Sequence, residues 1–306
     1  MTDVGTTSST ASATGPDRVT YGAVHLDVVD TAASLHFWRD IVGLVELPVA
    51  DDEIPLGVDS TPLIVLHRGA TRSAQPGDAG LYHVAIHLPD AAAFARVLAR
   101  LAAHRVPQSP TDHLFSMATY ATDPNGLMVE LTLETPERFG RFELTAGSVA
   151  MYDRDGVRRG PTERLDLELL RDVMPEDSVE GPLPAGTNVG HVHLHVPDLG
   201  DAVAFYRDVI GLDEHMIMDA IGMADLSAGG AFPHRLALNI WNGPDAVQPP
   251  AGSAAMRRFE LLVADRPAFD AVAERLRAAG TALSLTDDVI KTTDPAGNTI
   301  HVGLRA

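Results

Sequence analysis

The chain has 306 residues, 45% of them hydrophobic and 21% charged, which is enough for two globular domains and excludes global disorder. Its formal net charge of −19 disfavours nucleic acid and anionic membrane surfaces as partners, because both repel an acidic protein. It contains no cysteine, so disulfides and thiolate metal sites are excluded and any metal must be held by nitrogen and oxygen ligands.

Residues 1–18 are rich in Ser, Thr, Ala and Gly, a composition typical of a disordered tail. This stretch has neither the basic start nor the apolar segment of a secretion signal. No run of about 18 apolar residues, the length that spans a membrane, occurs elsewhere. We therefore expect a cytoplasmic protein without a membrane span.

An internal repeat begins directly after this tail. Residues 22–44 match residues 190–212 with a constant offset of 168 positions and no gap, and 11 of the 23 positions are identical. A second pair of similar segments begins at His83 and near Arg258, and each is followed by a DPxG sequence. Repetition over such long intervals predicts copies of a domain rather than a short-period solenoid.

The repeat divides the chain into four modules, at about 20–68, 80–134, 188–242 and 255–305. A module opens with a strand of alternating residues, as Val192 and Leu194 alternate with His191 and His193. An Asp then caps a helix that ends at a glycine such as Gly211. Further short β-rich segments follow, for example 62–67, 116–122, 127–133 and 235–241. The order βαβββ predicts an α+β fold.

The modules are expected to form two domains of two modules each, at 19–134 and 188–306. Residues 135–187 between them are charged and contain several Pro and Gly residues. We interpret this segment as a connector with one short helix within 164–173. A connector of this length allows the modules to pair either within each half or across the halves.

Residues 111–130 read TDHLFSMATYATDPNGLMVE and hold a His, a Tyr, a DPxG turn and a Glu. Pro fixes φ and Gly tolerates positive φ, so the turn joins the strand of Tyr120 to the strand of Glu130. Alternation along these strands then lets both side chains face one cavity. A carboxylate in so apolar a segment needs a partner, because an unpaired buried charge is costly.

Paired βαβββ modules with histidines on one strand face resemble the vicinal oxygen chelate (VOC) superfamily of glyoxalase I, bleomycin-resistance proteins and extradiol catechol dioxygenases. Segment 111–130 is similar to the extradiol signature, although Thr119 replaces the usual aliphatic residue before the Tyr. The layout is most similar to two-domain bacterial catechol 2,3-dioxygenases. The resemblance implies two VOC domains, Fe(II) or Mn(II), a small aromatic diol and O₂ as substrates. Homo-oligomers are common in this superfamily, but no feature of this sequence specifies a symmetry.

In this superfamily the metal ligands come from the first strand of one module and from the first and last strands of its partner. In chain order these positions hold Ala23, His83, Glu130, His191, Arg258 and His301. Pairing the first two modules leaves the site one ligand short, because Ala23 has no donor atom. Pairing the last two places the guanidinium of Arg258 at a ligand position, and a guanidinium cannot ligate. His25 shares the face of Ala23 but lies ~7 Å further along the strand.

Pairing the second module with the third instead gives His83, Glu130 and His191, so we expect these two modules to build one cavity across the halves and the first and fourth to pair without a metal. Two imidazoles and one carboxylate are the ligand set of non-haem Fe(II) oxygenases. The resemblance assigns acid–base catalysis to His113, because imidazole titrates near neutrality. It assigns to Tyr120 a hydrogen bond to a substrate oxygen that helps to deprotonate it.

Extradiol enzymes commonly have a further His near the end of the module that supplies the first ligand. The segment 235–241 contains none, so Asn239 and Trp241 occupy that region and are expected, with His193, to bind the substrate. The sequence gives no firm chemical role to the other histidines, which include His67, His87 and His234.

Two other functions stay open. A glyoxalase-type isomerase usually adds a carboxylate near the end of the first-ligand module, and segment 235–241 has neither Asp nor Glu. A metal-free binding protein, like the bleomycin-resistance members, is compatible with the missing ligands at Ala23 and Arg258.

Overall fold

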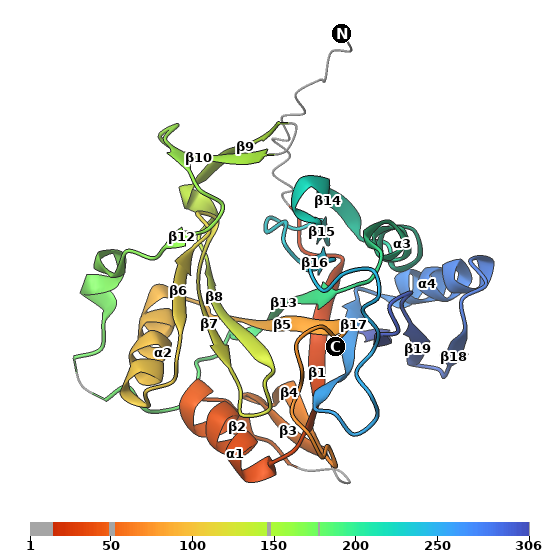
Figure 1. Cartoon of the computed structure of the whole chain (residues 1–306), viewed down its shortest axis with the longest axis horizontal. Coiled ribbons are helices and arrows are strands. Elements are labelled where there is room, and N and C mark those ends of the chain that lie inside the picture. Colours follow the sequence, from red (N-terminus) through yellow and green to blue (C-terminus); the bar gives the residue numbers. More distant parts are fainter. Residues whose placement is uncertain (1–14, 49–52, 146–147, 177, 306) are drawn as a thin grey trace.

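The structure is a computed structural model that describes residues 15–48, 53–145, 148–176 and 178–305. Two large sheets and one small sheet make up the fold (Figure 1). The predicted disorder of residues 1–14 lies outside the described residues. Within the described ranges, none of the helices has the length and apolar character needed to cross a membrane.

A curved nine-stranded sheet carries the candidate site. Its centre is formed by β5 (Gly80–His87) and β13 (Asn188–His195), which run antiparallel with His83 opposite His193. One flank continues from β5 through β8 (Met128–Glu134), β7 (Ser116–Thr122), β6 (Ser109–Asp112) and β12 (Glu163–Arg164). The other continues from β13 through β16 (Leu236–Asn239), β15 (Met223–Ser227) and β14 (Asp213–Met218). β5 and β13 thus join two flanks that stand apart in Figure 1.

The eight-stranded sheet is built in the same way around β1 (Val19–Val28) and β17 (Ala255–Val263), which are also antiparallel. Beyond β1 lie β4 (Thr61–Arg68), β3 (Glu53–Val58) and β2 (Val45–Glu46). Beyond β17 lie β20 (Thr299–Leu304), β19 (Val289–Thr293) and β18 (Leu283–Leu285).

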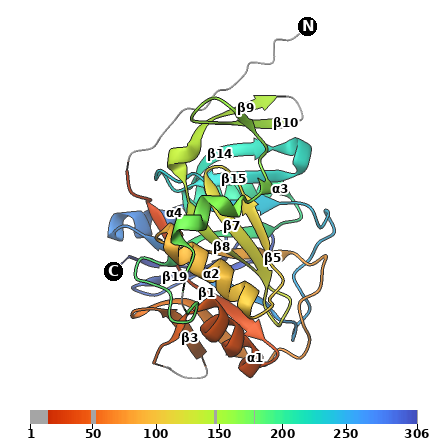
Figure 2. The same cartoon turned by 90° about the vertical axis from the view of Figure 1, so that its left-hand side faces the viewer.

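Each module has one main helix. In chain order these are α1 (Thr31–Leu35), α2 (Ala91–Ala103), α3 (Leu199–Ala204) and α4 (Arg266–Ala278). Short 3₁₀ helices span Pro136–Arg138, Leu167–Val173 and Asp219–Ile221. Figure 2 shows α2 lying across β7 and β8, where it covers the outer face of the nine-stranded sheet.

The chain order of the elements is βαβββ four times, with the last strand of each module parallel to its first. The predicted α+β fold of VOC modules is confirmed. The second module pairs with the third and the first with the fourth, as the ligand positions predicted. Each half of the chain therefore contributes to both large sheets.

The repeated helix has the same start and end in both halves. Asp30 and Asp198 cap α1 and α3 through their carboxylates, as the sequence predicted. Both helices then widen into π-helical turns, at His36–Val42 and Phe205–Ile210. Each turn ends at a glycine in the left-handed region, and for Gly211 φ is 97°. This ending returns the chain towards the sheet.

The connector is more structured than expected. β9 (Phe139–Thr145), β10 (Ser148–Asp153) and β11 (Arg158–Arg159) form a small sheet, and β12 extends the nine-stranded sheet. The predicted short helix within 164–173 corresponds to the 3₁₀ helix. Residues 15–18 of the expected tail also have defined contacts, because Arg18 N–H donates to Ala228 O and Asp17 pairs with Arg235.

The hydrophobic core is continuous between the two large sheets. One cluster of buried side chains includes Leu26 and Phe259 from the eight-stranded sheet and Val84 and Leu194 from the nine-stranded sheet. A second, smaller cluster lies under the connector and consists of Leu114, Phe142, Met151 and Met216, with Phe115, Phe139 and Met218 packed against it.

Candidate metal centre

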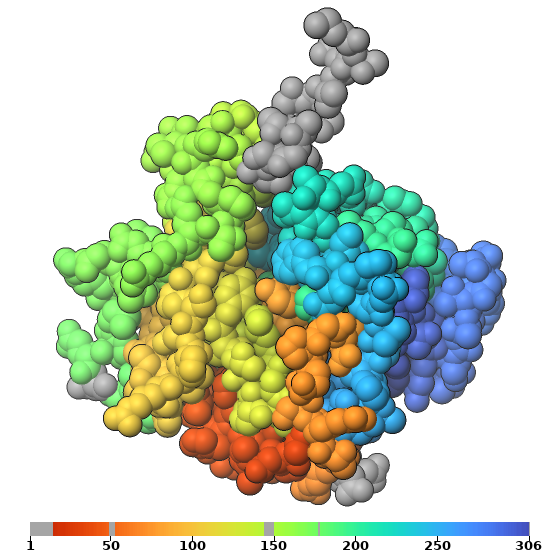
Figure 3. Space-filling view, viewed as in Figure 1, coloured from red at the N-terminus to blue at the C-terminus, as the bar shows by residue number. Residues whose placement is uncertain are grey.

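A cavity of about 320 Å³ lies in the concave side of the nine-stranded sheet. Its walls come from the second module, the third module and the connector. Figure 3 shows a hollow between the connector, in light green, and the region of β14, in teal.

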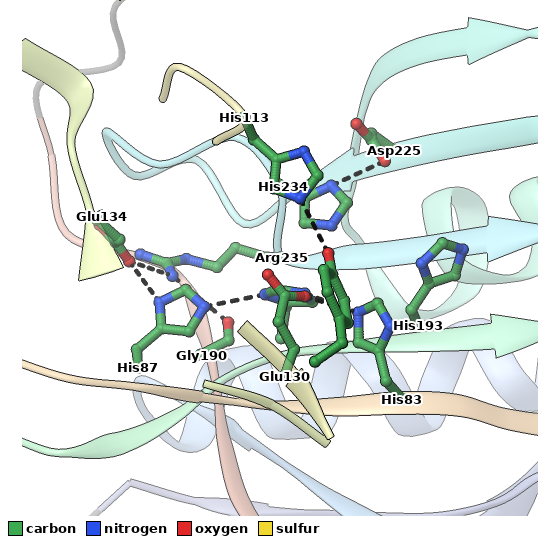
Figure 4. Close-up of polar contacts among 12 residues, drawn as sticks. His83, His87, His113, Glu130, Glu134, Gly190, His193, Asp225, His234 and Arg235 are labelled. Carbon is green, nitrogen blue, oxygen red and sulfur yellow. Dashed lines mark hydrogen bonds and ion pairs between the residues drawn. The ribbon is translucent and has the colours of Figure 1, made fainter. Parts of the chain in front are cut away.

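Three buried side chains from three strands meet in this cavity. His83 on β5, Glu130 on β8 and His191 on β13 are exposed by 2%, 3% and 1%. Glu130 Oε2 lies 2.9 Å from His83 Nε2 and 3.1 Å from His191 Nε2, and the two Nε2 atoms are 3.2 Å apart. Figure 4 shows His83 and Glu130 pointing towards the same space. The structure thus brings together the three side chains predicted as ligands.

The spacing of these three atoms suits one metal ion. Two ligands at right angles around an ion, each bonded at about 2.1 Å, lie about 3.0 Å apart. The observed separations of 2.9, 3.1 and 3.2 Å are close to this value for all three pairs. Three ligands on one face leave the opposite face of an ion free for substrate.

The surroundings of the three groups favour the protonation states that ligands need, and burial does so for the two histidines. Burial lowers the pKa of both His83 and His191, so the imidazoles are neutral near pH 7. Burial alone would raise the pKa of Glu130, but the two adjoining imidazoles hold it well below its usual range. The site therefore combines two neutral nitrogen donors with one anionic oxygen donor.

His191 is oriented by a chain of hydrogen bonds behind it. His191 Nδ1 lies 2.9 Å from His87 Nε2, and His87 Nδ1 lies 2.8 Å from Glu134 Oε1. Glu134 also pairs with Arg235 at 2.8 Å (Figure 4). The carboxylate can only accept, so His87 donates from Nδ1 and, being neutral through burial, accepts at Nε2. His191 must then donate from Nδ1, which leaves its Nε2 lone pair facing the cavity.

His113 and Tyr120 lie beside the three ligand candidates and hydrogen-bond each other. His113 Nδ1 is 2.9 Å from the Pro161 carbonyl, and His113 Nε2 is 2.9 Å from the Tyr120 hydroxyl. The carbonyl accepts from Nδ1–H, so a neutral His113 accepts from the tyrosine at Nε2. Burial and the charge of Glu130 raise the pKa of Tyr120 well above its usual value. Tyr120 is therefore a hydrogen-bond donor at neutral pH.

His234, to which the sequence assigned no role, also lines the cavity. Its ring centroid is 4.5 Å from that of His191, and its Nδ1 is 2.9 Å from Asp225 Oδ1 (Figure 4). Burial opposes protonation, but the Asp225 carboxylate outweighs it and raises the pKa of His234. His234 could have been identified from the sequence, because it lies directly before segment 235–241, near the module end where the resemblance implies a further His.

The three predicted substrate-binding residues divide into two groups. His193 and Trp241 line the cavity, but Asn239 is 0% exposed and lies behind them. Its Nδ2 donates to His193 Nε2 at 2.9 Å, and its Oδ1 accepts from Trp241 N–H at 3.2 Å. The structure thus corrects the expectation for Asn239, which orients the two lining residues and does not reach the cavity itself.

The eight-stranded sheet holds a second cluster, formed by His25, His67 and Glu53. His25 Nδ1 lies 2.8 Å from His67 Nε2, and Glu53 Oε1 lies 3.8 Å from the same His67 nitrogen. A guanidinium nitrogen of Arg258 is 3.3 Å from Glu53 Oε1, so this carboxylate is already paired with a positive charge. This cluster is less suited to a dication than the cluster around Glu130.

Two neutral imidazoles and a carboxylate, held in a cavity between paired βαβββ modules, define a candidate metal centre of the VOC type. The chain belongs to the Glyoxalase/Bleomycin resistance protein/Dioxygenase superfamily, whose family model matches residues 20–131 and 188–302. The superfamily resemblance predicted from the repeat is confirmed.

Individual relatives agree with this assignment. The chain is 32% identical over 280 residues to catechol-2,3-dioxygenase of Bacillus subtilis (strain 168), covering 90% of this chain and 93% of the relative. Its fold is similar to glyoxalase I from Zea mays, with a TM-score of 0.54, 15% identity and 94% and 93% of the two chains covered. The cppA protein from Streptococcus pneumoniae TIGR4 gives a TM-score of 0.53 at 12% identity, with 94% and 98% covered. The two solved structures support the fold alone.

Proposed function

We propose that the protein is a non-haem Fe(II) extradiol dioxygenase that cleaves a catechol-type ring with O₂. The observation that carries the proposal is the convergence of His83, Glu130 and His191 within 2.9 to 3.2 Å of one another. The 32% identity to a catechol-2,3-dioxygenase over nine-tenths of the chain supports the same reaction class.

The proposed reaction needs no outside reductant. One ring C–C bond next to the diol breaks, the O–O bond breaks, and both oxygen atoms stay in the product. The diol loses its two hydroxyl protons on binding, and the ring-opened product takes protons back. When bound, Fe(II) supplies coordination positions for the diol oxygens and O₂ and carries the electrons between them. Mn(II) is the alternative ion, because the same ligands suit it.

The side chains around the three ligands handle the protons. The Tyr120 oxygen accepts a hydrogen bond from one diol hydroxyl and takes up its proton as the Tyr120 O–H proton moves to His113 Nε2. His113 then returns that proton to the ring-derived oxygen. His234, whose pKa the Asp225 carboxylate raises against the effect of burial, offers a hydrogen-bond donor where negative charge develops on oxygen.

The remaining cavity walls position the ring. His193 and Trp241 form one wall, and Asn239 holds both of them from behind. Such fixed walls orient the diol so that both of its oxygens face the ligand cluster.

The test is anaerobic loading with Fe(II), removal of excess iron, and addition of catechols followed by air. We expect O₂ uptake and a yellow ring-opened product. His83→Ala and Glu130→Ala should lose both the stoichiometric iron and the activity, whereas His36→Ala, at an exposed site, should keep both. Iron bound by these ligands without O₂ uptake for any catechol would contradict the proposal.

No specific observation favours a glyoxalase-type isomerase. The other carboxylate that lines the cavity, Asp225, is already paired with His234 at 2.9 Å. A methylglyoxal–glutathione assay on the same metal-loaded protein separates the two reactions. A stoichiometric metal lost in Glu130→Ala would also contradict a metal-free binding protein.

A further inference from the structure

The cavity has a polar end and an apolar end. The ligand candidates, His113, Tyr120 and His234 form the polar end. The apolar end is formed by aromatic and thioether side chains, namely Phe115, Phe142, Met151, Met216, Met218 and Met223. Four of the nine methionines of the chain therefore line one cavity. Such side chains offer a surface that adapts to apolar ligands.

The apolar end begins directly beside the proposed catalytic groups. The ring centroid of Phe115 is 6.3 Å from those of His113, His234 and Phe142. A ring held between His113 and the ligand cluster would therefore point any substituent on that side at the Phe115 and Phe142 faces. Aromatic faces pack well against rings and alkyl groups.

No Arg or Lys side chain lines the cavity in the part of the chain that the structure describes, so none can pair with an anionic substituent at its apolar end. The acidic residues Glu130 and Asp225 do line it. The closest Arg in sequence to the lining residues of the third module, Arg235, is engaged by Glu134 and Asp17 at 2.8 Å each. Figure 4 shows its side chain directed towards Glu134. A carboxylate at the apolar end would lie among Phe and Met side chains without a cationic partner, which is costly.

The cavity is also larger than a bare ring requires. A cavity of about 150 Å³ is sufficient for benzene. The present cavity of about 320 Å³ is roughly twice as large, which leaves room for a substituent of several carbon atoms.

We propose that the substrate is a catechol with an uncharged, apolar substituent, either an alkyl chain or a second ring, that lies against the wall formed by Phe115, Phe142, Met216 and Met218. This inference rests on the proposed function. Catechols that carry a carboxylate are rejected by the same wall. The wall is supplied by the connector strand β9, by β14 and by Phe115, and not by the strands that hold the ligand candidates. Its selectivity can therefore be changed without changing the ligands.

The experiment compares kcat/KM of the Fe(II)-loaded protein for catechol, for 3- and 4-alkyl and phenyl catechols, and for 3,4-dihydroxybenzoate and 3,4-dihydroxyphenylacetate. A hydrophobic pocket discriminates about tenfold or more for each methylene that it accommodates. We expect at least tenfold higher kcat/KM for the best apolar catechol than for catechol. For both carboxylated catechols we expect values at least about a hundredfold lower than for that best substrate.

A charge placed in the wall gives the matched variant. Met218→Arg should lower kcat/KM for the apolar catechols at least about tenfold and raise it for the carboxylated ones, with iron stoichiometry unchanged. Met174→Arg, which introduces the same charge at an exposed connector residue outside the cavity lining, should change neither. Met218→Leu keeps the wall apolar and should keep the wild-type order of substrates.

The outcomes separate this inference from the proposed function. Ring cleavage with equal kcat/KM for all catechols, or with a preference for the carboxylated ones, would overturn the inference and leave the dioxygenase proposal standing. An unchanged substrate order in Met218→Arg would also overturn it. Absence of ring cleavage for every catechol, with iron bound, would overturn both.

Discussion

His191 depends on a residue that touches no part of the cavity. His87 accepts a hydrogen bond from His191 Nδ1 and donates one from its own Nδ1 to Glu134, which fixes the orientation of both rings. Because these hydrogen bonds select the tautomer of His191, they also select which of its nitrogens faces the cavity. His87 therefore determines whether His191 is ready to act as a ligand in the proposed metal site.

We predict that His87→Phe weakens Fe(II) binding about 10- to 100-fold, because a buried His191 Nδ1–H then has no acceptor and the ring is free to turn. The dissociation constant can be measured by competition with a chelator. His36→Phe, at an exposed site on the π-helical turn after α1, is the control and should bind iron like the wild type. Equal affinity in His87→Phe would show that the hydrogen-bond chain has no positioning role.

Glu134 should also make stability depend on pH. Burial alone would raise its pKa, but the His87 hydrogen bond and Arg235 lower it from 4.5 to about 2. A lowered pKa means that the stabilisation is complete above pH 4.5 and is lost as the pH falls towards 2. Glu134→Gln should cost on the order of 2 kcal/mol at pH 7, after allowance for its partial exposure. Urea unfolding across pH 2.5–7 measures this, and a difference between the two proteins that does not shrink at low pH would contradict it.

The superfamily resemblance supplied six candidate positions for the ligands, and the chemistry of their side chains then selected among them. Ala23 has no donor atom and Arg258 cannot ligate, so one combination of positions remained. The same reasoning missed His234, because the search for a further His began one residue after it. It also expected Asn239 at the cavity, because a position within segment 235–241 does not show that His193 and Trp241 lie in front of it.

At the scale of the element, a β-bulge makes room for His87. The pairing of β13 with β5 is interrupted between Val189 and His191. At Gly190, between them, an added Cβ would lie 2.1 Å from the His87 ring. A close approach of this kind is a common reason for a glycine within a strand.

We predict that Gly190→Ala displaces the His87 ring and lowers iron affinity at least tenfold, together with a loss of roughly 1–3 kcal/mol in the free energy of unfolding. Gly200→Ala, at an exposed position in α3, is the matched control and should be neutral or stabilising by up to about 1 kcal/mol. Chelator competition and urea unfolding of both variants decide the matter, and equal behaviour of the two would contradict the account.

The main elements of each module were predictable, since Asp30, Asp198 and Gly211 mark helix ends with strong local signals. The π-helical turns were not, because the spacing of apolar residues barely differs between an α-helix and a single wider turn. Two of the connector strands, β11 and β12, were missed because strands of two residues each show no alternation to detect.

At the scale of the whole molecule, the four modules form two sheets that each contain one module from either half. Unfolding of one half removes one side of both sheets, and the continuous core joins the sheets to each other. We predict a single calorimetric unfolding transition for residues 1–306. Its midpoint temperature should increase when metal binds, and no second transition should separate from it. Two transitions, of which only one responds to metal, would show that the sheets are independent.

The pairing of the modules could be predicted from the sequence only through the metal. Hydrophobic patterns are nearly the same in all four modules, so packing alone allows both pairings. The requirement that three donor atoms meet is what distinguishes them, and a chain without His83 or His191 would have given no basis for the choice.

The central claim is that two histidines and a glutamate from opposite halves of the chain hold one iron ion. Anomalous diffraction at the iron absorption edge, on crystals grown with Fe(II), tests it most directly. We predict one strong peak at bonding distance, about 2.0–2.2 Å, from His83 Nε2, His191 Nε2 and Glu130 Oε2. A peak at the cluster of His25, His67 and Glu53, with none between His83 and His191, would contradict the account.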